Sequence, residues 1–166
     1  DEQNRPITVG GCVCFPSSWS LPEKLGLSIA EVHEVVPGMN AVLGERVYRL
    51  MLALKAGEGW VRSNWSSKAS SERNHHPQQP LPEMNLPLDP GRVWLRREHQ
   101  ILFRLPETGG IVFGIRIENM SLRQVLEDPE TARRWARGLR TMPAALLDYK
   151  RLLDVRGELA ELLVGK

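Results

Sequence analysis

Five consecutive polar residues interrupt the most strand-like stretch of this sequence. Because side chains alternate between the two faces of a strand, Arg96, Glu98 and Gln100 would share one face. Arg97 and His99 would lie on the other face. Buried charges are costly unless they are paired or face water or a ligand. The pattern therefore has two interpretations: a sheet with one solvated face, or a sheet face that lines a polar pocket.

A second polar pair lies in residues 60–66, W-V-R-S-N-W-S, which we predict to form another strand. Arg62 and Asn64 would share one face of this strand. The tryptophans of the predicted strands are interpreted as core packing rather than cofactor contacts: Trp60, Trp65 and Trp94.

The polar residues would be positioned by a largely antiparallel sheet. A hairpin is predicted at residues 93–119, because Gly109 and Gly110 can adopt the positive φ angles of a tight turn. Pro106 ends the first strand of this hairpin. A further strand is predicted at residues 7–15, I-T-V-G-G-C-V-C-F.

Helices are predicted before and after these strands. Ser28 with Glu31 three residues later has the spacing of a capping box, and Ser121 is another N-cap. Amphipathic patterns predict longer helices at residues 41–56, 130–139 and 144–164. Since strands and helices are segregated along the chain, we predict an α+β fold.

The length, net charge and cysteine content of the chain narrow the class of protein. A chain of 166 residues suits one domain, residues 1–166, with a long loop at 67–91. A net charge of +2 does not indicate binding to nucleic acid or to an anionic membrane, and no apolar run has the length of a membrane span. Cys12 and Cys14 are interpreted as buried thiols, which favours a reducing, cytoplasmic setting.

Five motifs follow one another in the sequence: C-F-P-S-S-W-S-L-P-E-K-L-G, I-A-E-V-H-E-V-V-P-G, R-S-N-W, L-R-R-E-H-Q-I-L-F-R-L-P and G-G-I-V-F-G-I-R. In this order they resemble the haem-dependent oxidative N-demethylase family. The resemblance covers residues 9–122 and extends more loosely to Tyr149 and Lys150.

The resemblance implies a haem-binding, PAS-like domain similar to the family's alpha subunit. Such a domain has a five-stranded antiparallel sheet with short helices over one face, and C-terminal helices follow. Haem b would lie between the short helices and the sheet. From the resemblance we also expect an N-terminal segment before the first strand, which this sequence would lack. If that segment closes the haem pocket, a shortened chain would bind haem poorly or not at all.

His33 is the residue that the resemblance favours as axial ligand of the haem iron. It lies in V-H-E-V-V-P-G, at the end of a short predicted helix. A neutral imidazole is the usual proximal ligand where oxygen must bind on the opposite side. The alternative is that His33 only forms a hydrogen bond with a loop carbonyl.

The resemblance also implies that the polar sheet face forms the distal wall of the pocket. A cation or donor there would stabilise negative charge on bound oxygen, and a carboxylate would hold a dialkylammonium substrate or accept its proton. We predict a cofactor contact for Asn64 and catalytic roles for Arg62, Arg96, Glu98 and Gln100. Each of them alternatively braces the sheet, for example through an ion pair between Arg96 and Glu98.

In the family, the reaction is oxidation of a small secondary amine, such as dimethylamine, with O2 and electrons from NADPH. A separate reductase with FMN and a 2Fe-2S cluster delivers the electrons. This chain has no dinucleotide-binding fingerprint and only two cysteines, so it would be the haem subunit of a complex.

Two features leave other interpretations open. His99 stands where the family motif R-x-E-R-Q has its second arginine, and it could reach the haem as a second ligand. The predicted C-terminal helix suits a homodimer as well as packing within one chain. The alternative to an enzyme is a haem-based sensor of a gas or small molecule, or a non-catalytic PAS-like interaction module.

Overall fold

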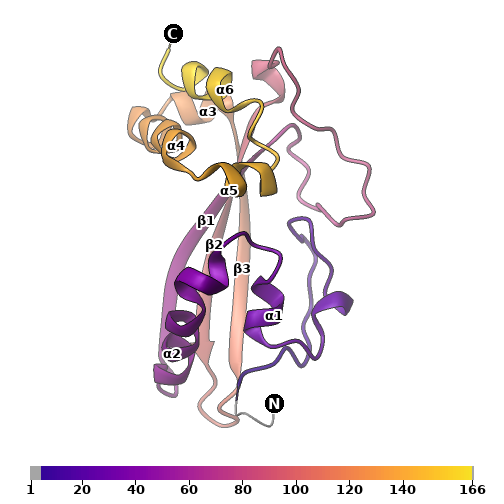
Figure 1. Ribbon diagram of the computed structural model, residues 1–166, viewed down its shortest axis with the longest axis vertical. Coiled ribbons are helices and arrows are strands. Elements are labelled where there is room, and N and C mark those ends of the chain that lie inside the picture. The colour runs from indigo at the N-terminus through magenta and orange to yellow at the C-terminus, as the bar shows by residue number, and fades with distance from the viewer. Residues whose placement is uncertain (1–4, 166) are drawn as a thin grey trace. The chain divides into compact units, whose positions relative to one another are not determined.

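The computed structural model describes residues 5–165, and in this part of the chain three antiparallel strands form one sheet (Figure 1). These strands are β1 (Gly59–Lys68), β2 (Trp94–Arg104) and β3 (Ile111–Ser121), in the order β1-β2-β3. The central strand β2 therefore pairs on both sides, and it is the strand that carries the five consecutive polar residues.

The predicted hairpin is confirmed, and its turn sets the pairing of β2 with β3. The Leu105 N–H donates to the Gly110 carbonyl at 2.8 Å, and Gly109 has a φ of 69°. A positive φ costs little at glycine because glycine has no Cβ atom. Arg104 consequently lies opposite Ile111, and every later pair follows from that register.

The prediction of a five-stranded PAS-like sheet is wrong. Residues 7–15 form no strand, and Ile7 makes only an isolated bridge with Ser28. Gly10 and Gly11 interrupt this segment, and glycine weakens a strand because it loses entropy on ordering and offers no side chain to pack.

The interpretation of the two cysteines as buried thiols is also wrong. Cys12 and Cys14 are free and exposed. Because residues 7–15 form no strand, no paired element carries these two side chains into a core.

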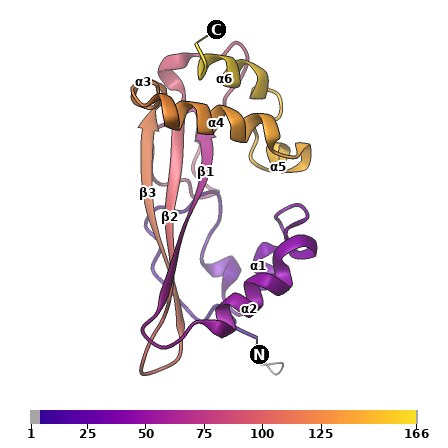
Figure 2. The same ribbon diagram turned by 90° about the vertical axis from the view of Figure 1, so that its left-hand side faces the viewer.

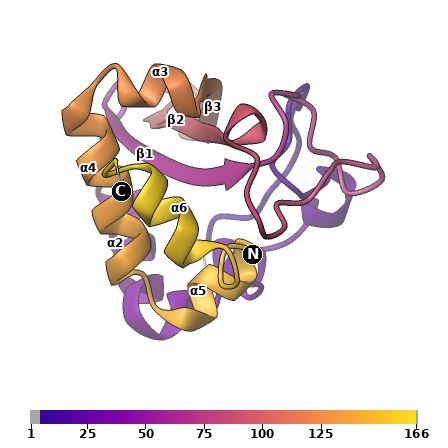
Figure 3. The ribbon, with the colours of Figure 1, turned by 90° about the horizontal axis from the view of Figure 1, so that it is seen from above.

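The described residues fall into two compact units, and the main hydrophobic core belongs to unit 2. This unit comprises Trp65–Arg73, Gln79–Arg97 and the chain from Ile117 onward. Its helical elements are η3 (Pro90–Arg92), α3 (Leu122–Leu126), α4 (Pro129–Thr141), α5 (Ala144–Tyr149) and α6 (Arg156–Leu162). In it, α4 packs against both α3 and α6 (Figures 2 and 3).

The indole of Trp135 ties α4 to β1 within this core. Trp135 is 3% exposed, and its Nε1–H donates to Ser67 Oγ at 3.0 Å. Leu139, one turn later on the same helix, is fully buried. The predicted helix at residues 130–139 and its inward-facing residues are therefore confirmed.

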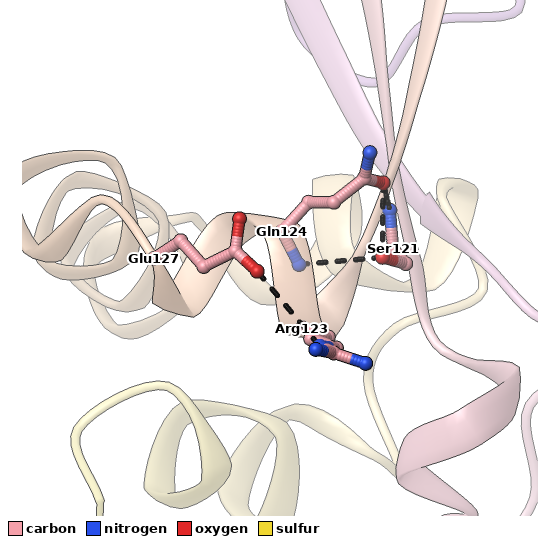
Figure 4. A network of polar contacts seen from close by, with 4 residues as sticks. All are labelled: Ser121, Arg123, Gln124 and Glu127. Atoms are coloured by element: carbon pink, nitrogen blue, oxygen red, sulfur yellow. Dashed lines mark hydrogen bonds and ion pairs between the residues drawn. The ribbon is translucent and has the colours of Figure 1, made fainter.

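A capping box joins the end of β3 to the start of α3 (Figure 4). The Ser121 N–H donates to Gln124 Oε1 at 2.8 Å, and the Gln124 N–H donates to Ser121 Oγ at 3.3 Å. Arg123 of α3 and Glu127, the C-cap residue of this helix, approach to 3.8 Å. Two helix N–H groups that would otherwise lack partners are satisfied, as the N-cap at Ser121 predicted.

The long C-terminal helix predicted at residues 144–164 is two helices, α5 and α6. The chain breaks at Arg151, whose φ is 57°. In a continuous helix, Leu147 and Leu152 would point in directions about 140° apart, because each residue turns by about 100°. The break allows both leucines to be fully buried, together with Leu159. These leucines therefore pack within the chain.

Unit 1 comprises the described chain up to Asn64 together with Asn74–Gln78 and Glu98–Arg116. Its helices are η1 (Pro22–Lys24), α1 (Ile29–His33), the π-helix η2 (Asn40–Gly44) and α2 (Glu45–Ala53) (Figure 1). The helix predicted at residues 41–56 is thus a π-helical turn followed by α2. None of the helices between residues 5 and 165 combines the length and the apolar character needed to span a membrane.

We expect Gly138→Ala to destabilise unit 2, although alanine is the better helix former. A Cβ atom at this position of α4 would lie 2.6 Å from Trp65 Cζ2, so the indole or the helix would have to move. Overpacking of this kind costs about 1–3 kcal/mol, whereas the gain in helix propensity is about 1 kcal/mol. The free energy of unfolding, measured in urea, is expected to fall.

Gly157→Ala in α6 is the matched control for this substitution. A Cβ at Gly157 would meet no atom within 4 Å. The free energy of unfolding of the Gly157→Ala variant is expected to stay the same, or to rise by up to about 1 kcal/mol because alanine is the better helix former. An equal gain for both variants would show that Trp65 does not restrict position 138.

Candidate functional site

Four of the predicted site residues form one hydrogen-bonded network in unit 1. Arg62 Nε donates to Gln100 Oε1 at 2.6 Å, and Gln100 Nε2 donates to Glu98 Oε2 at 2.7 Å. Asn64 Nδ2 donates to the same Glu98 oxygen at 3.3 Å. Arg62 and Asn64 come from β1, and Glu98 and Gln100 come from β2. The register of these two strands places Arg62 across from Gln100 and Asn64 across from Glu98, whereas Gln100 reaches Glu98 along β2 itself.

The network lies on one face of the sheet in unit 1, which we call the Gln100 face. It consists of the residues that alternation places beside Gln100: Trp60, Arg62, Asn64, Glu98, Leu102, Arg104, Ile111, Phe113 and Ile115. Arg104 Nη2 donates to the Met51 carbonyl at 2.9 Å. The C-terminal end of α2 therefore approaches the sheet from the Gln100 face.

Glu98 and Gln100 are buried, with 8% and 6% exposure. Their burial is tolerated because the amide of Gln100 accepts from Arg62 and donates to Glu98, so neither polar group is left without a partner. One carboxylate oxygen of Glu98, Oε2, accepts both hydrogen bonds. Among residues 5–165, Oε1 accepts none, which leaves it able to bind a cation or take up a proton.

A capping box positions the short helix that carries His33. The Ser28 N–H donates to Glu31 Oε2 at 2.7 Å, and the Glu31 N–H donates to Ser28 Oγ at 3.4 Å. The hydrogen bonds from Ser28 lower the pKa of Glu31. This confirms the predicted N-cap, and it fixes the start of α1 one turn before His33, its last residue.

The imidazole of His33 is half-buried, and it is close enough to Arg62 to respond to that residue's charge. Burial lowers the pKa of His33 below its ordinary value of 6.5, and the positive charge of Arg62 lowers it further. Around neutral pH the ring is therefore uncharged, which is the protonation state that a metal ligand requires.

The stability of the apoprotein is expected to fall as the pH is lowered from about 6.5 through the lower folded-state pKa of His33. In this range the unfolded chain binds a proton at His33 and the folded chain does not, so protons favour unfolding. Urea unfolding of the apoprotein at several pH values would measure how steeply the free energy of unfolding changes with pH. His33→Gln, which cannot titrate, is expected to reduce this pH dependence, and an unchanged slope would contradict the assignment.

Arg96 does not join the network. It belongs to unit 2, is 1% exposed, and donates to the carbonyls of Arg73 at 2.9 Å and Glu72 at 3.4 Å. Asn119 donates to the Glu72 carbonyl as well, at 3.1 Å. The guanidinium thus satisfies carbonyl groups of the segment that follows β1, and its predicted catalytic role stays a prediction.

His99 lies on the opposite face of the sheet from Arg62 and Gln100, and we call this side of unit 1 the His99 face. Its other residues are Val61, Ser63, Ile101, Phe103, Val112, Gly114 and Arg116. The hypothesis that His99 is a second haem-reaching residue therefore gains no support from its position in β2.

Two aromatic residues of the Gln100 face were not predicted as part of the site. Trp60 is 58% exposed and Phe113 is 51% exposed, so the interpretation of Trp60 as core packing is wrong. Trp65, by contrast, does pack against the main core, and Trp94 is half-buried. The alternation that grouped Arg62 with Asn64 also places Trp60 beside them, and this was the available signal.

The side chains of unit 1 suit the haem that the sequence resemblance implies. Haem is a flat apolar ring with two carboxylate groups and an iron that needs an axial ligand. Unit 1 offers the neutral imidazole of His33, the exposed rings of Trp60 and Phe113, and the exposed cation of Arg62. Within residues 5–165, no three His, Cys, Asp or Glu side chains group to hold a metal ion.

The chain matches a known protein family. The model of a family described as haem-dependent oxidative N-demethylase, alpha subunit-like, matches residues 1–160 of the 166-residue chain. The match therefore includes most of both compact units and every residue of the network.

Proposed function

The chain belongs to the haem-dependent oxidative N-demethylase, alpha subunit-like family, and we propose that it is the haem subunit of an enzyme that demethylates a small secondary amine such as dimethylamine. The observation that carries the proposal is the buried carboxylate of Glu98, held by two amide donors with one oxygen available. A buried carboxylate of this kind attracts an organic cation, and an alkylammonium ion is the charged form of such a substrate.

We propose that His33 is the axial ligand of haem b and that Asn64 contributes to the cofactor pocket. When bound, haem supplies the redox chemistry that activates O2. The lowered pKa of His33 keeps its imidazole neutral, so the nitrogen lone pair remains available to iron. Trp60 and Phe113 would contact the apolar ring, and Arg62 would compensate negative charge in the pocket.

In this proposal Glu98 binds the protonated amine and accepts its proton before oxidation. Gln100 is a positioning residue, because its amide connects Glu98 with Arg62 and holds both side chains in one orientation. Arg62 and Asn64 supply hydrogen-bond donors that stabilise negative charge as it develops. Each group stands on a paired strand rather than a loop, which limits its movement.

The electrons would come from a partner. The family description places this chain among alpha subunit-like proteins, so a further subunit is expected in the complex. We propose a reductase that carries FMN and a 2Fe-2S cluster and oxidises NADPH in the cytoplasm, since two cysteines are too few to ligate such a cluster.

Reconstitution with haemin followed by an assay of amine oxidation would test the proposal. We expect a Soret band at one haem per chain, and formaldehyde release from dimethylamine when a chemical or enzymatic reductant is added in air. Ligand binding at the haem without any turnover across small secondary amines would support a sensor instead. Failure to bind haem would reject both functions.

A further inference from the structure

We propose that the His99 face of unit 1 carries a second ligand site, which binds a small carboxylate with an apolar body. An open groove of about 530 Å³ lies there. It is lined by Val61, Ser63, His99, Ile101 and Arg116, together with Arg62 and Gln100 of the network. The side chains of Ser63, His99 and Arg116 lie on the opposite face of the sheet from Glu98 and Gln100, so they would hold a ligand on the face away from the proposed haem pocket.

The strand register places three polar side chains of the groove in one row. The pairing of Arg62 with Gln100 puts Ser63 directly opposite His99, and the hairpin register puts Arg116 on the other side of His99. Neighbouring strands are about 4.8 Å apart, so this row spans about 10 Å across the sheet. It offers the hydroxyl of Ser63 and the guanidinium of Arg116 to one ligand, with His99 between them.

The charge of the groove favours an anion. Arg116 is exposed and, among the described residues, makes no ion pair or side-chain hydrogen bond. No acidic residue lines the groove, so the positive charge of Arg116 is not neutralised locally. A guanidinium binds a carboxylate through two parallel N–H donors, which gives it direction as well as attraction.

A row of apolar residues runs beside the polar one. Val61 is 80% exposed and Ile101 is 40% exposed, although both belong to paired strands. Their neighbour on β3 is Gly114, where a Cβ would lie only 2.8 Å from Ile101 Cγ2. The absence of a side chain at Gly114 thus leaves the surface of Ile101 open. An exposed apolar strip beside a cation favours a ligand that is apolar at one side and anionic at the other.

The test uses naphthalene-2-carboxylate as the probe and naphthalene-2-carboxamide as its neutral match of nearly the same shape. We expect the carboxylate to bind with a dissociation constant below a millimolar and the carboxamide to bind at least ten-fold more weakly. Methyl NMR locates the site, since Ile101 lies on the His99 face and Ile115 lies on the Gln100 face. The carboxylate is expected to shift the methyl resonances of Ile101 and Val61 and to leave those of Ile115 unchanged.

Arg116→Gln is expected to weaken carboxylate binding at least ten-fold, whereas Arg46→Gln, at an exposed position of α2, is expected to change it less than two-fold. Both positions are exposed, so neither variant should affect folding. Equal binding of carboxylate and carboxamide, shifts at Ile115 instead of Ile101, or unchanged binding by Arg116→Gln would each overturn the proposal. Haem-loaded protein should bind the probe as the apoprotein does, so failure of haem reconstitution leaves this test valid.

Discussion

Replacement of His33 by alanine is expected to remove haem binding. Mutation of the groups that merely support a metal ligand costs about 10–100-fold in affinity, so loss of the axial ligand itself should cost at least about 100-fold. His33 is the last residue of α1, and its side chain is half-buried, so alanine should leave the capping box of Ser28 and Glu31 intact. Titration of the apoprotein with haemin, followed at the Soret band, measures the change.

Two companion experiments separate ligation from a structural role. In a His33→Gly variant, added imidazole is expected to restore the Soret band, because the free ring can occupy the space of the missing side chain. His99→Ala is the matched control, and it should keep haem, since His99 lies on the opposite face from Gln100. A Soret band in His33→Ala identical to that of the native protein would reject His33 as the ligand.

Replacement of Glu98 by glutamine is expected to reduce amine turnover by about 10²–10⁴-fold, the usual contribution of a positioned acid–base group. Glutamine has nearly the same shape, and its oxygen can still accept from Asn64 and Gln100. The network should therefore persist without its negative charge, and haem binding should change little. Steady-state formaldehyde release, normalised to bound haem, measures the effect.

Glu118→Gln is the matched control for Glu98→Gln. Glu118 is also a strand carboxylate, but it is paired with Arg97 at 3.6 Å and half-exposed, so its loss should change turnover by no more than about three-fold. If haem content falls in step with activity in Glu98→Gln, then Glu98 only supports the fold. If turnover is unchanged, another group accepts the proton.

Local sequence patterns determined several features of this protein correctly. Gly109 predicted the turn of the hairpin and has the expected positive φ, whereas Gly110 does not. Alternation predicted that Glu98 and Gln100 share a face. The serines at 28 and 121 predicted two helix starts, and both form capping boxes. These features depend on interactions between residues a few positions apart, so the local sequence contains all the groups that produce them.

Only the tertiary structure decided which segments pair as strands, where a helix breaks and which charges are buried. Residues 7–15 have the composition of a strand but form no ladder, and the apolar pattern of residues 144–164 breaks at Arg151 so that Leu147 and Leu152 both reach the core. Likewise, alternation along β2 groups Arg96 with the site residues Glu98 and Gln100, yet Arg96 binds the carbonyls of Glu72 and Arg73. Strand pairing, helix breaks and the burial of a charge depend on groups far away in the sequence, and their free energies override local preference.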